Sequence, residues 1–306
     1  MLIYVAGVNG MVGSAIASKA RSHGHEVVGK SSNDLDFTDR DLVFKELSSV
    51  DPDCLVIAAA KVGGIGANST FPVDFLSINL QIQTNLMDAA HAVGTEKVLF
   101  LGSSCMYPKF ATQPIKESEL LTGELEPTNA AYAISKIAGL KLIQAYRQQF
   151  GHRWISAMPS NLYGPRDNFN LESAHVLPAL LHRFHNAKVA ETASVTIWGD
   201  GTPLREFLHV DDLARACLRL LEDYDETVAI NVGSGQEISI ANLAELISEI
   251  VGFKGSIKFN TDRPNGTPRK LLNSEKITML GWKPEISLLD GITTTYNWFL
   301  ENRVRG

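Results

Sequence analysis

Short apolar runs alternate with longer helical patterns through the first half of the 306-residue chain, and this alternation limits the possible folds more than any other feature. The apolar runs lie at 2–6, 26–29, 55–58, 97–102 and 154–159, and apolar side chains recur at helical spacing at 11–23, 39–47, 78–93 and 132–150. Strands that alternate with helices are joined by crossovers, so they form a parallel sheet with helices on both faces. The sequence therefore predicts an α/β fold with a doubly wound parallel sheet.

The second half of the chain has a different pattern. After about residue 160 the chain becomes rich in turns, as in Trp198-Gly199-Asp200-Gly201-Thr202, and we expect helices near 177–186 and 211–223. A further apolar run at 229–232 is expected to return to the sheet. We therefore expect two interleaved parts: a nucleotide-binding domain at 1–165 plus about 205–235, and a smaller α/β substrate-binding lobe at about 166–204 and 236–306.

Composition excludes several classes of protein. The 28 Lys+Arg and 34 Asp+Glu give a net charge of −6, which does not suit a nucleic-acid-binding surface. The longest apolar run, 54–60, is far shorter than the roughly twenty residues that a helix needs to cross a bilayer. Cys54, Cys105 and Cys217 are scattered without metal-ligand spacing, and such a sparse, odd set fits a reducing compartment. We therefore expect a cytoplasmic protein that binds no membrane, nucleic acid or metal.

A glycine-rich turn follows the first predicted strand and begins the first predicted helix. Its sequence, Gly7-Val8-Asn9-Gly10-Met11-Val12-Gly13, has the spacing GxxGxxG. Glycines let the backbone approach a pyrophosphate, and free N–H groups at a helix start bind its charge. A plain strand-to-helix turn explains two of the three glycines, but the position after the first strand favours a nucleotide site. The residues expected to contact that nucleotide are Gly7, Asn9, Gly10, Met11, Val12 and Gly13.

The end of the second predicted strand bears on the choice between NAD and NADP. An NAD enzyme is expected to have an acid there for the ribose hydroxyls, whereas this chain has Lys30-Ser31-Ser32-Asn33. A cation beside hydroxyls suits the extra phosphate of NADP, although Lys30 is equally explained as a solvated surface charge. We expect NADP(H) as the cofactor, with Lys30 among its contacts.

Tyr132 and Lys136 form a Tyr-x-x-x-Lys pattern within a predicted helix. Residues four apart lie on one helix face, so the ammonium can lie beside the phenol and lower its pKa from about 10 toward working pH. An isolated pair of this kind is better explained as one buried ring and one snorkelling lysine. Here, however, Ser103 follows the fourth predicted strand, at the edge where parallel sheets bind ligands.

The chain resembles the extended short-chain dehydrogenases/reductases. It has their motifs in the same order: a glycine-rich turn, a serine after the fourth strand and Tyr-x-x-x-Lys. The resemblance implies a Rossmann domain in which Ser103 polarises a carbonyl, Tyr132 donates a proton, and Lys136 holds the ribose and tunes the phenol. It also implies further cofactor contacts at the ends of the fourth and fifth strands and near the substrate lobe: Leu101, Gly102, Ser103, Ser104, Pro159, Ser160, Asn161, Leu162 and His175. Asn161 is expected to face the nicotinamide.

Longer strings resemble one branch of that family, the GDP-L-fucose synthases. They include Ala59-Ala60-Lys61-Val62-Gly63-Gly64-Ile65, Ser103-Ser104-Cys105-Met106-Tyr107-Pro108-Lys109, Arg205-Glu206-Phe207-Leu208-His209-Val210-Asp211-Asp212 and Gly266-Thr267-Pro268-Arg269-Lys270. Such enzymes epimerise GDP-4-keto-6-deoxy-D-mannose at C3 and C5 and reduce the C4 ketone with NADPH. The resemblance implies that Cys105 and His175 are the acid/base pair, and that the substrate is bound by Arg183, Trp198, Arg205, Asn265 and Lys270.

Two departures from that branch leave alternatives open. Val8-Asn9 replaces a basic residue that often lies near the adenosine phosphate, and Asn265 replaces an aspartate. A GDP-colitose synthase or a GDP-deoxyheptose epimerase/reductase reuses the same residues. A non-catalytic NADP-sensing protein on the same fold is the alternative from another class.

The resemblance also implies a homodimer in which helices of two subunits form a four-helix bundle. Its candidate helices are 78–93 and the one that carries Tyr132. Candidate contact residues, which core packing explains equally well, are Ile82, Leu86, Met87, Leu140, Ile143 and Tyr146.

Overall fold

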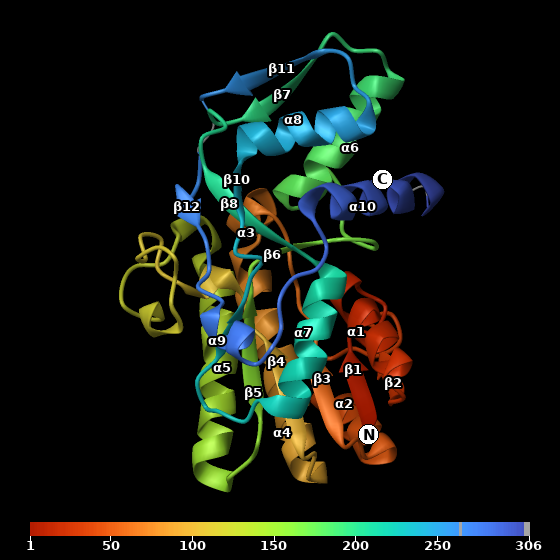
Figure 1. The fold of residues 1–306 in the computed structure, drawn as a ribbon. Helices are drawn as coiled ribbons and strands as arrows, with labels where there is room; N and C mark the ends of the chain where they lie inside the picture. Colours follow the sequence, from red (N-terminus) through yellow and green to blue (C-terminus); the bar gives the residue numbers. More distant parts are fainter. Residues whose placement is uncertain (263–264, 303–306) are drawn as a thin grey trace.

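The computed structural model describes residues 1–262 and 265–302. A six-stranded parallel sheet occupies one half of the molecule, and a lobe of shorter strands and helices occupies the other (Figure 1). In spatial order the strands of this sheet are β2 (Glu26–Lys30), β1 (Leu2–Ala6), β3 (Cys54–Ile57), β4 (Lys97–Leu101), β5 (Ile155–Pro159) and β9 (Ile230–Val232). The predicted α/β fold is confirmed, and each predicted strand is present to within one or two residues.

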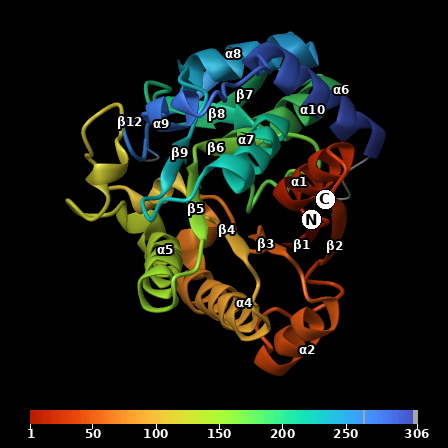
Figure 2. The ribbon, with the colours of Figure 1, turned by 60° about the horizontal axis from the view of Figure 1, so that its bottom comes forward.

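Helices cover both faces of the sheet because alternate strand residues point to opposite sides and are apolar on both. On one face α1 (Met11–Ser22) and α7 (Val210–Asp223) pack together over Ile3, Val5 and Val56. On the other face α2 (Arg40–Val50), α4 (Asn79–Val93) and α5 (Ala130–Phe150) pack over Tyr4, Leu55 and Phe100. Figure 2 shows the two helical layers on opposite sides of the strands. The doubly wound arrangement therefore agrees with the sequence prediction.

The candidate dimer residues contribute to this core. Ile82, Leu86, Met87, Leu140, Ile143 and Tyr146 are each at most 8% exposed. Their prediction as subunit contacts is therefore wrong, because the inner faces of α4 and α5 bury them against the sheet and against each other. The outer face of α5 instead exposes Ile134 at 48%.

The lobe is built on short strands that pair over long sequence distances. β8 (Leu204–His209) pairs with β6 (Asn161–Tyr163), β10 (Glu237–Ser239) and β12 (Arg269–Lys270), and β7 (Ser194–Trp198) pairs with β11 (Ser256–Asn260). Helices α6 (Val176–Val189), α8 (Ile240–Val251) and α10 (Leu288–Asn302) enclose its own apolar core. The remaining α-helices are short: α3 (Ile65–Thr70) follows β3, and α9 (Glu275–Met279) follows β12. A π-helical turn at Asp74–Ile78 leads directly into α4.

The boundaries between the nucleotide-binding domain and the substrate-binding lobe stay a prediction. β6 and most of β8 lie in segments expected to be nucleotide-binding, yet they pair within the lobe sheet, whereas α7 and β9 lie with the parallel sheet. Residues 263–264 and 303–306 of the expected lobe lie outside the described residues. No helix in 1–262 or 265–302 is both long and apolar enough to cross a membrane.

Candidate active site

The glycine-rich turn brings three chain segments into close contact at the carboxyl edge of the sheet. Gly7 has φ +86°, and a Cβ on it would lie 2.9 Å from the Ala59 nitrogen. A Cβ on Gly13 would lie 2.1 Å from the Gly7 oxygen, so α1 approaches the turn more closely than any side chain permits. α1 begins after Gly10 with no side-chain cap, so N–H groups of its first turn have no acceptor within the helix. This turn fits a dinucleotide pyrophosphate.

The turn that follows β2 contains an acid, Asp34, that the sequence analysis did not anticipate. The Lys30 carbonyl accepts hydrogen bonds from the N–H groups of Gly7 and Val8, at 2.8 and 3.2 Å, which ties β2 to the glycine-rich turn. Asp34 folds back on the end of β2, and its Oδ2 accepts from the Ser31 hydroxyl at 2.5 Å and the Ser31 N–H at 3.0 Å. These bonds, with the charge of Lys30, lower the pKa of Asp34. The Ser-x-x-Asp spacing of Ser31 and Asp34 could have indicated this turn in the sequence.

Ser103, Tyr132 and Lys136 meet where β4 ends. Ser103 begins a 3-10 turn at 104–106, and its Oγ accepts from the Cys105 N–H at 3.2 Å. Lys136 is 4% exposed, its Nζ donates to the Leu101 carbonyl at 2.9 Å, and it lies 5.9 Å from the centre of the Tyr132 ring. The structure thus brings together the three residues that the family resemblance names.

The pKa of Tyr132 differs from the sequence expectation. It is raised, first because burial disfavours the phenolate and second because the charge of Cys105 opposes it, while a hydrogen bond with Ser103 lowers it. Burial also lowers the pKa of Lys136 to about 8. The prediction that the lysine lowers the phenol pKa is therefore wrong in this structure, because Lys136 is directed to the Leu101 carbonyl and is itself desolvated.

Cys105, His175 and Lys270 form a second group beside the first. The Lys270 ammonium donates to the Cys105 sulfur at 3.7 Å. His175 lies at the start of α6 and remains accessible to solvent. Its pKa is lowered mainly because the protein around the ring reduces its hydration, and further by the charge of Lys270. One cation therefore acts on both residues of the expected acid/base pair.

A contact between the two halves of the molecule positions the chain just before His175. The Gly64 N–H, in the segment between β3 and α3, donates to the Ser173 carbonyl at 2.8 Å. A Cβ on Gly64 would lie 2.4 Å from the Ala174 oxygen. Glycine at position 64 is therefore required for this close approach, and sequence reasoning gave Gly64 no separate role.

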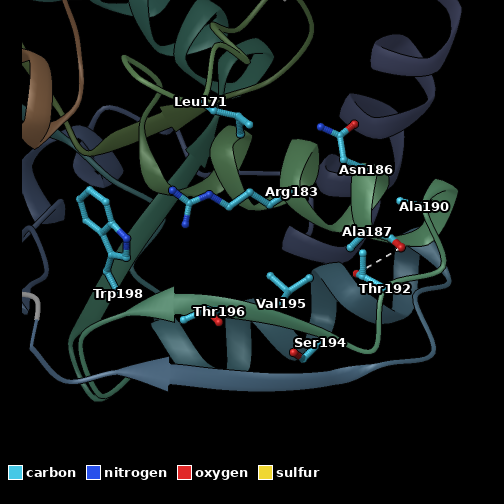
Figure 3. A pocket seen from close by; sticks show the side chains of 10 residues that line it. All are labelled: Leu171, Arg183, Asn186, Ala187, Ala190, Thr192, Ser194, Val195, Thr196 and Trp198. Carbon is cyan, nitrogen blue, oxygen red and sulfur yellow. Dashed lines mark hydrogen bonds between the residues drawn. The ribbon is translucent and has the colours of Figure 1, made fainter.

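The cations expected to bind substrate come from different lobe elements. Arg205 lies on β8, and burial lowers its pKa while the charges of Cys105 and Glu126 oppose that shift. Arg183, on α6, lies 5.7 Å from the centre of the Trp198 ring at the end of β7. Figure 3 shows Arg183 extended toward Trp198 across a cavity of about 450 Å³ between α6 and β7. A cavity of this size, with an exposed indole and a guanidinium, suits a nucleoside diphosphate.

A second cavity, of about 690 Å³, lies along α1 and includes Asn9, Met11 and Arg166 in its wall. It adjoins the glycine-rich turn, so it belongs to the cofactor side of the site.

Three of the predicted contact residues are engaged within the protein. The Asn265 Oδ1 accepts from the Asp200 N–H at 3.0 Å, so Asn265 supports the turn that follows Trp198. The Asn161 Nδ2 donates to the Glu206 carbonyl at 2.7 Å, which links β6 to β8. The Ser160 N–H donates to the Val232 carbonyl at 3.0 Å, whereas its buried hydroxyl has no partner among the described residues. Pro159 ends β5, Leu162 lies in β6, and Gly102 and Ser104 follow β4.

The described residues contain no group of three or more His, Cys, Asp or Glu side chains that could hold a metal ion.

A family model described as the NAD dependent epimerase/dehydratase family matches residues 3–233. The chain is 56% identical to GDP-L-fucose synthase 1 of Arabidopsis thaliana over 98% of this chain and 93% of that protein. It is 48% identical to the GDP-L-fucose synthase of Escherichia coli (strain K12), over 99% and 98%. The GDP-L-colitose synthase of Yersinia pseudotuberculosis is 36% identical over 99% of both chains.

Solved structures of enzymes named for GDP-linked sugars are also similar to this chain. A GDP-6-OMe-4-keto-L-xylo-heptose reductase from C. jejuni has a TM-score of 0.93 at 32% identity, covering 98% of each chain. A GDP-L-fucose synthetase from Naegleria fowleri, bound to NADP, has a TM-score of 0.91 at 29% identity, over 99% of this chain and 94% of that one. These similarities extend over both the parallel sheet and the lobe.

Proposed function

The chain belongs to the NAD dependent epimerase/dehydratase family, and we propose that it converts GDP-4-keto-6-deoxy-D-mannose to GDP-L-fucose with NADPH. The reaction consists of epimerisation at C3 and C5 followed by reduction of the C4 ketone. Each half requires its own set of side chains: one set lies where β4 ends, and the other spans from the turn after β4 to the start of α6.

Reduction is assigned to Ser103, Tyr132 and Lys136. A ketone accepts a hydride at carbon and a proton at oxygen, and NADPH supplies the hydride when bound. The Tyr132 hydroxyl donates the proton, and its raised pKa keeps it protonated for that role. When the ketone is bound, the Ser103 hydroxyl donates its hydrogen bond to the ketone oxygen instead of to Tyr132, and this orients the carbonyl. The Leu101 carbonyl holds Lys136 beside the Tyr132 ring, and its ammonium is assigned to the cofactor ribose.

Epimerisation is assigned to Cys105 and His175. A proton beside the C4 ketone is acidic because its removal gives an enolate, and inversion requires a base on one face of the sugar and an acid on the other. Cys105 belongs to the parallel-sheet half and His175 to the start of α6, so the two side chains approach the sugar from different parts of the fold. Lys270 lies beside the cysteine, where its charge stabilises negative charge on sulfur or on the enolate oxygen.

The cofactor fits the residues of the glycine-rich turn. The close approach at Gly7 and Gly13 leaves room for a pyrophosphate where a side chain would otherwise lie, and the α1 N-terminus provides N–H donors. Lys30, at the end of β2, is assigned to the adenosine phosphate. The GDP end of the substrate is assigned to Arg183 and Trp198, with Arg205 and Lys270 nearer the sugar.

The observation that carries this proposal is the contact between Lys270 and Cys105 beside the Ser103, Tyr132 and Lys136 group. A plain ketone reductase needs only Ser103, Tyr132 and Lys136. A cation that acts on both a thiol and an imidazole supports proton transfer at carbon in addition to reduction.

The experiment that tests the proposal compares GDP-linked keto-sugars. Purified protein and NADPH are mixed separately with GDP-4-keto-6-deoxy-D-mannose and with its 3-deoxy analogue, and nicotinamide absorbance is followed before the products are identified by NMR. We expect faster NADPH loss with the first sugar and GDP-L-fucose as its product. Preference for the 3-deoxy sugar identifies a colitose synthase, and preference for a GDP-deoxyheptose identifies the heptose enzyme. Tight NADPH binding without turnover of any sugar identifies a sensor.

We also propose a cytoplasmic homodimer that associates through the outer face of α5. Along that face Ala131, Ile134, Ala138, Leu142 and Ala145 recur at helical spacing and are half-buried or exposed. Sedimentation of the wild-type protein and of Ile134→Glu tests this, because a charge in the interface favours the monomer. An Ile134→Glu variant that still sediments as the wild-type dimer would contradict it.

A further inference from the structure

Glu206 is a fully buried carboxylate that the proposed chemistry does not use. It is 0% exposed and lies on β8, next to Arg205 in the chain. No ion pair supplies it with a cation within residues 1–262 and 265–302. A buried charge without a counter-ion is costly, so its place in the fold calls for a specific role.

Backbone N–H groups from two segments hold this carboxylate. The Leu272 N–H donates to Oε2 at 3.0 Å, and the Gly235 N–H donates to Oε1 at 2.7 Å. Gly233 makes room for the carboxylate, since a Cβ there would lie 2.4 Å from Oε1. Burial raises the pKa of Glu206 to about 7, and the N–H donors oppose that rise. Glu206 therefore links the β9–β10 loop to the segment that follows β12.

That segment carries Lys270, two residues before Leu272. β12 consists only of Arg269 and Lys270 and pairs with one strand, β8, where Lys270 lies opposite Arg205. Two ladder positions do not fix a segment by themselves, so its position depends on the contacts around it. One side is held by Gln113, whose Oε1 accepts from the Leu271 N–H at 2.9 Å, and by Ile115, which bonds the backbone of Leu271 and Asn273 at 2.8 Å each. Glu206 holds the buried side.

We propose that Glu206 is a positioning residue that holds the β12 segment so that the Lys270 ammonium lies against the Cys105 sulfur. Only the effect of Glu206 on catalysis rests on the proposed function. The position of Lys270 is a property of the chain without substrate. Loss of the carboxylate removes the acceptor of the Leu272 N–H, so the segment shifts on its buried side and the ammonium moves away from the sulfur. The residue acts through Lys270 and does not touch the sugar.

The test measures the rate at which iodoacetamide alkylates Cys105 at neutral pH in the full-length protein. Iodoacetamide reacts with the thiolate, which a neighbouring ammonium favours. Cys54 and Cys217 are 0% exposed, so peptide mapping separates them from Cys105. Glu206→Gln keeps the shape of the side chain but replaces one acceptor oxygen with a donor, so it cannot accept both N–H groups. We expect Glu206→Gln and Lys270→Met each to slow alkylation at neutral pH by about tenfold.

Glu237→Gln is the matched control. Glu237 lies opposite Glu206 in the β10–β8 pairing, and its carboxylate binds Arg269, the other residue of β12, at 2.8 Å. The control removes the same charge from the same pair of strands but keeps the bond to Leu272. We expect it to alkylate at the wild-type rate. NADPH affinity should remain unchanged in all three variants.

A double variant separates positioning from general destabilisation. If Glu206 acts through Lys270, Glu206→Gln in the Lys270→Met background slows alkylation no further. If Glu206→Gln does not fold, Glu206→Asp, which keeps the charge but shortens the side chain, replaces it in the same comparison. Wild-type alkylation in the Glu206 variant, an equal loss in Glu237→Gln, or additive losses in the double variant would overturn the proposal. Because no sugar is used, these results do not depend on the proposed reaction.

Discussion

The Lys270 ammonium lies 3.7 Å from the Cys105 sulfur, although 165 residues separate the two in the chain. The contact joins the turn after β4 to a two-residue strand of the lobe. It places a cation beside Cys105, and the charge of that cation also acts on His175, the other residue assigned to proton transfer at carbon. The two chemistries therefore share one site while depending on different side chains, and variants should separate them.

Tyr132→Phe should remove reduction and preserve proton exchange at carbon. The phenyl ring keeps the packing against Lys136 and Phe75 but has no proton to give to the ketone oxygen. We expect NADPH oxidation to fall by about 10²–10⁴-fold, the usual range for loss of a general acid. Solvent deuterium should still enter the sugar in the presence of oxidised cofactor. Wild-type NADPH oxidation in this variant would remove Tyr132 from the mechanism.

Cys105→Ser should have the opposite effect. A hydroxyl at this position has about the same size but is a far weaker acid than a thiol, so the sugar C–H bonds exchange more slowly. We expect exchange at C3 and C5 to slow by at least about 10²-fold while NADPH affinity stays at the wild-type value. Titration of bound NADPH by fluorescence provides the affinity. Unchanged exchange would exclude Cys105 as an acid or base.

Gly64→Ala should slow proton exchange at the sugar carbons by displacing the segment before His175. The added methyl group would lie 2.4 Å from the Ala174 oxygen, so the segment before His175 must shift. We expect slower exchange at carbon and a loss of about 1–3 kcal/mol in the free energy of unfolding. Gly66→Ala is the control, because its Cβ would meet only one atom, the Glu172 oxygen, at 3.8 Å. Equal exchange rates in both variants would contradict the positioning role of Gly64.

Lys136→Met should change the pH dependence of stability in a defined direction. Burial lowers the pKa of Lys136 from 10.5 to about 8, so between these values the unfolded chain binds more protons at this residue than the folded chain. Lys136 therefore makes the free energy of unfolding of the wild type rise with pH over that interval. Below pH 8 the folded protein carries the buried charge in full, so Lys136 destabilises it by the largest amount there. The stability of Lys136→Met relative to wild type should therefore decrease as the pH rises from 8 to 10.5. Urea unfolding at both pH values measures this difference, and a constant difference would contradict it.

Arg183→Ala should weaken nucleotide binding without affecting the cofactor. The guanidinium lies over the exposed Trp198 ring at the cavity between α6 and β7. We expect the affinity for GDP to fall by about tenfold or more, consistent with an arginine contact worth on the order of 1–2 kcal/mol. Arg219→Ala is the control, because Arg219 pairs with Asp223 on the surface of α7. GDP binding by calorimetry distinguishes the two variants, and equal affinities would exclude Arg183.

The parallel sheet was predictable because its strands are continuous apolar runs and its helices repeat at helical spacing. The lobe was less predictable from the sequence, because β6, β10 and β12 have only two or three residues each. Their pairing depends on β8, which is distant in the chain, and not on local sequence. Ser103, Tyr132 and Lys136 were indicated by spacing and by order along the chain. The contacts of Glu206 and Gly64 gave no local signal, because they arise only when distant segments pack together.

Product labelling in deuterated water tests whether this one site both epimerises the sugar and reduces the ketone. The protein is mixed with GDP-4-keto-6-deoxy-D-mannose and NADPH in deuterium oxide, and the product sugar is examined by proton NMR once the NADPH is consumed. The account predicts an L-sugar with deuterium at both C3 and C5 and one NADPH oxidised for each product molecule. A reduced D-sugar that retains its protons at C3 and C5 would show a reductase alone, and would contradict the assignment of Cys105 and His175.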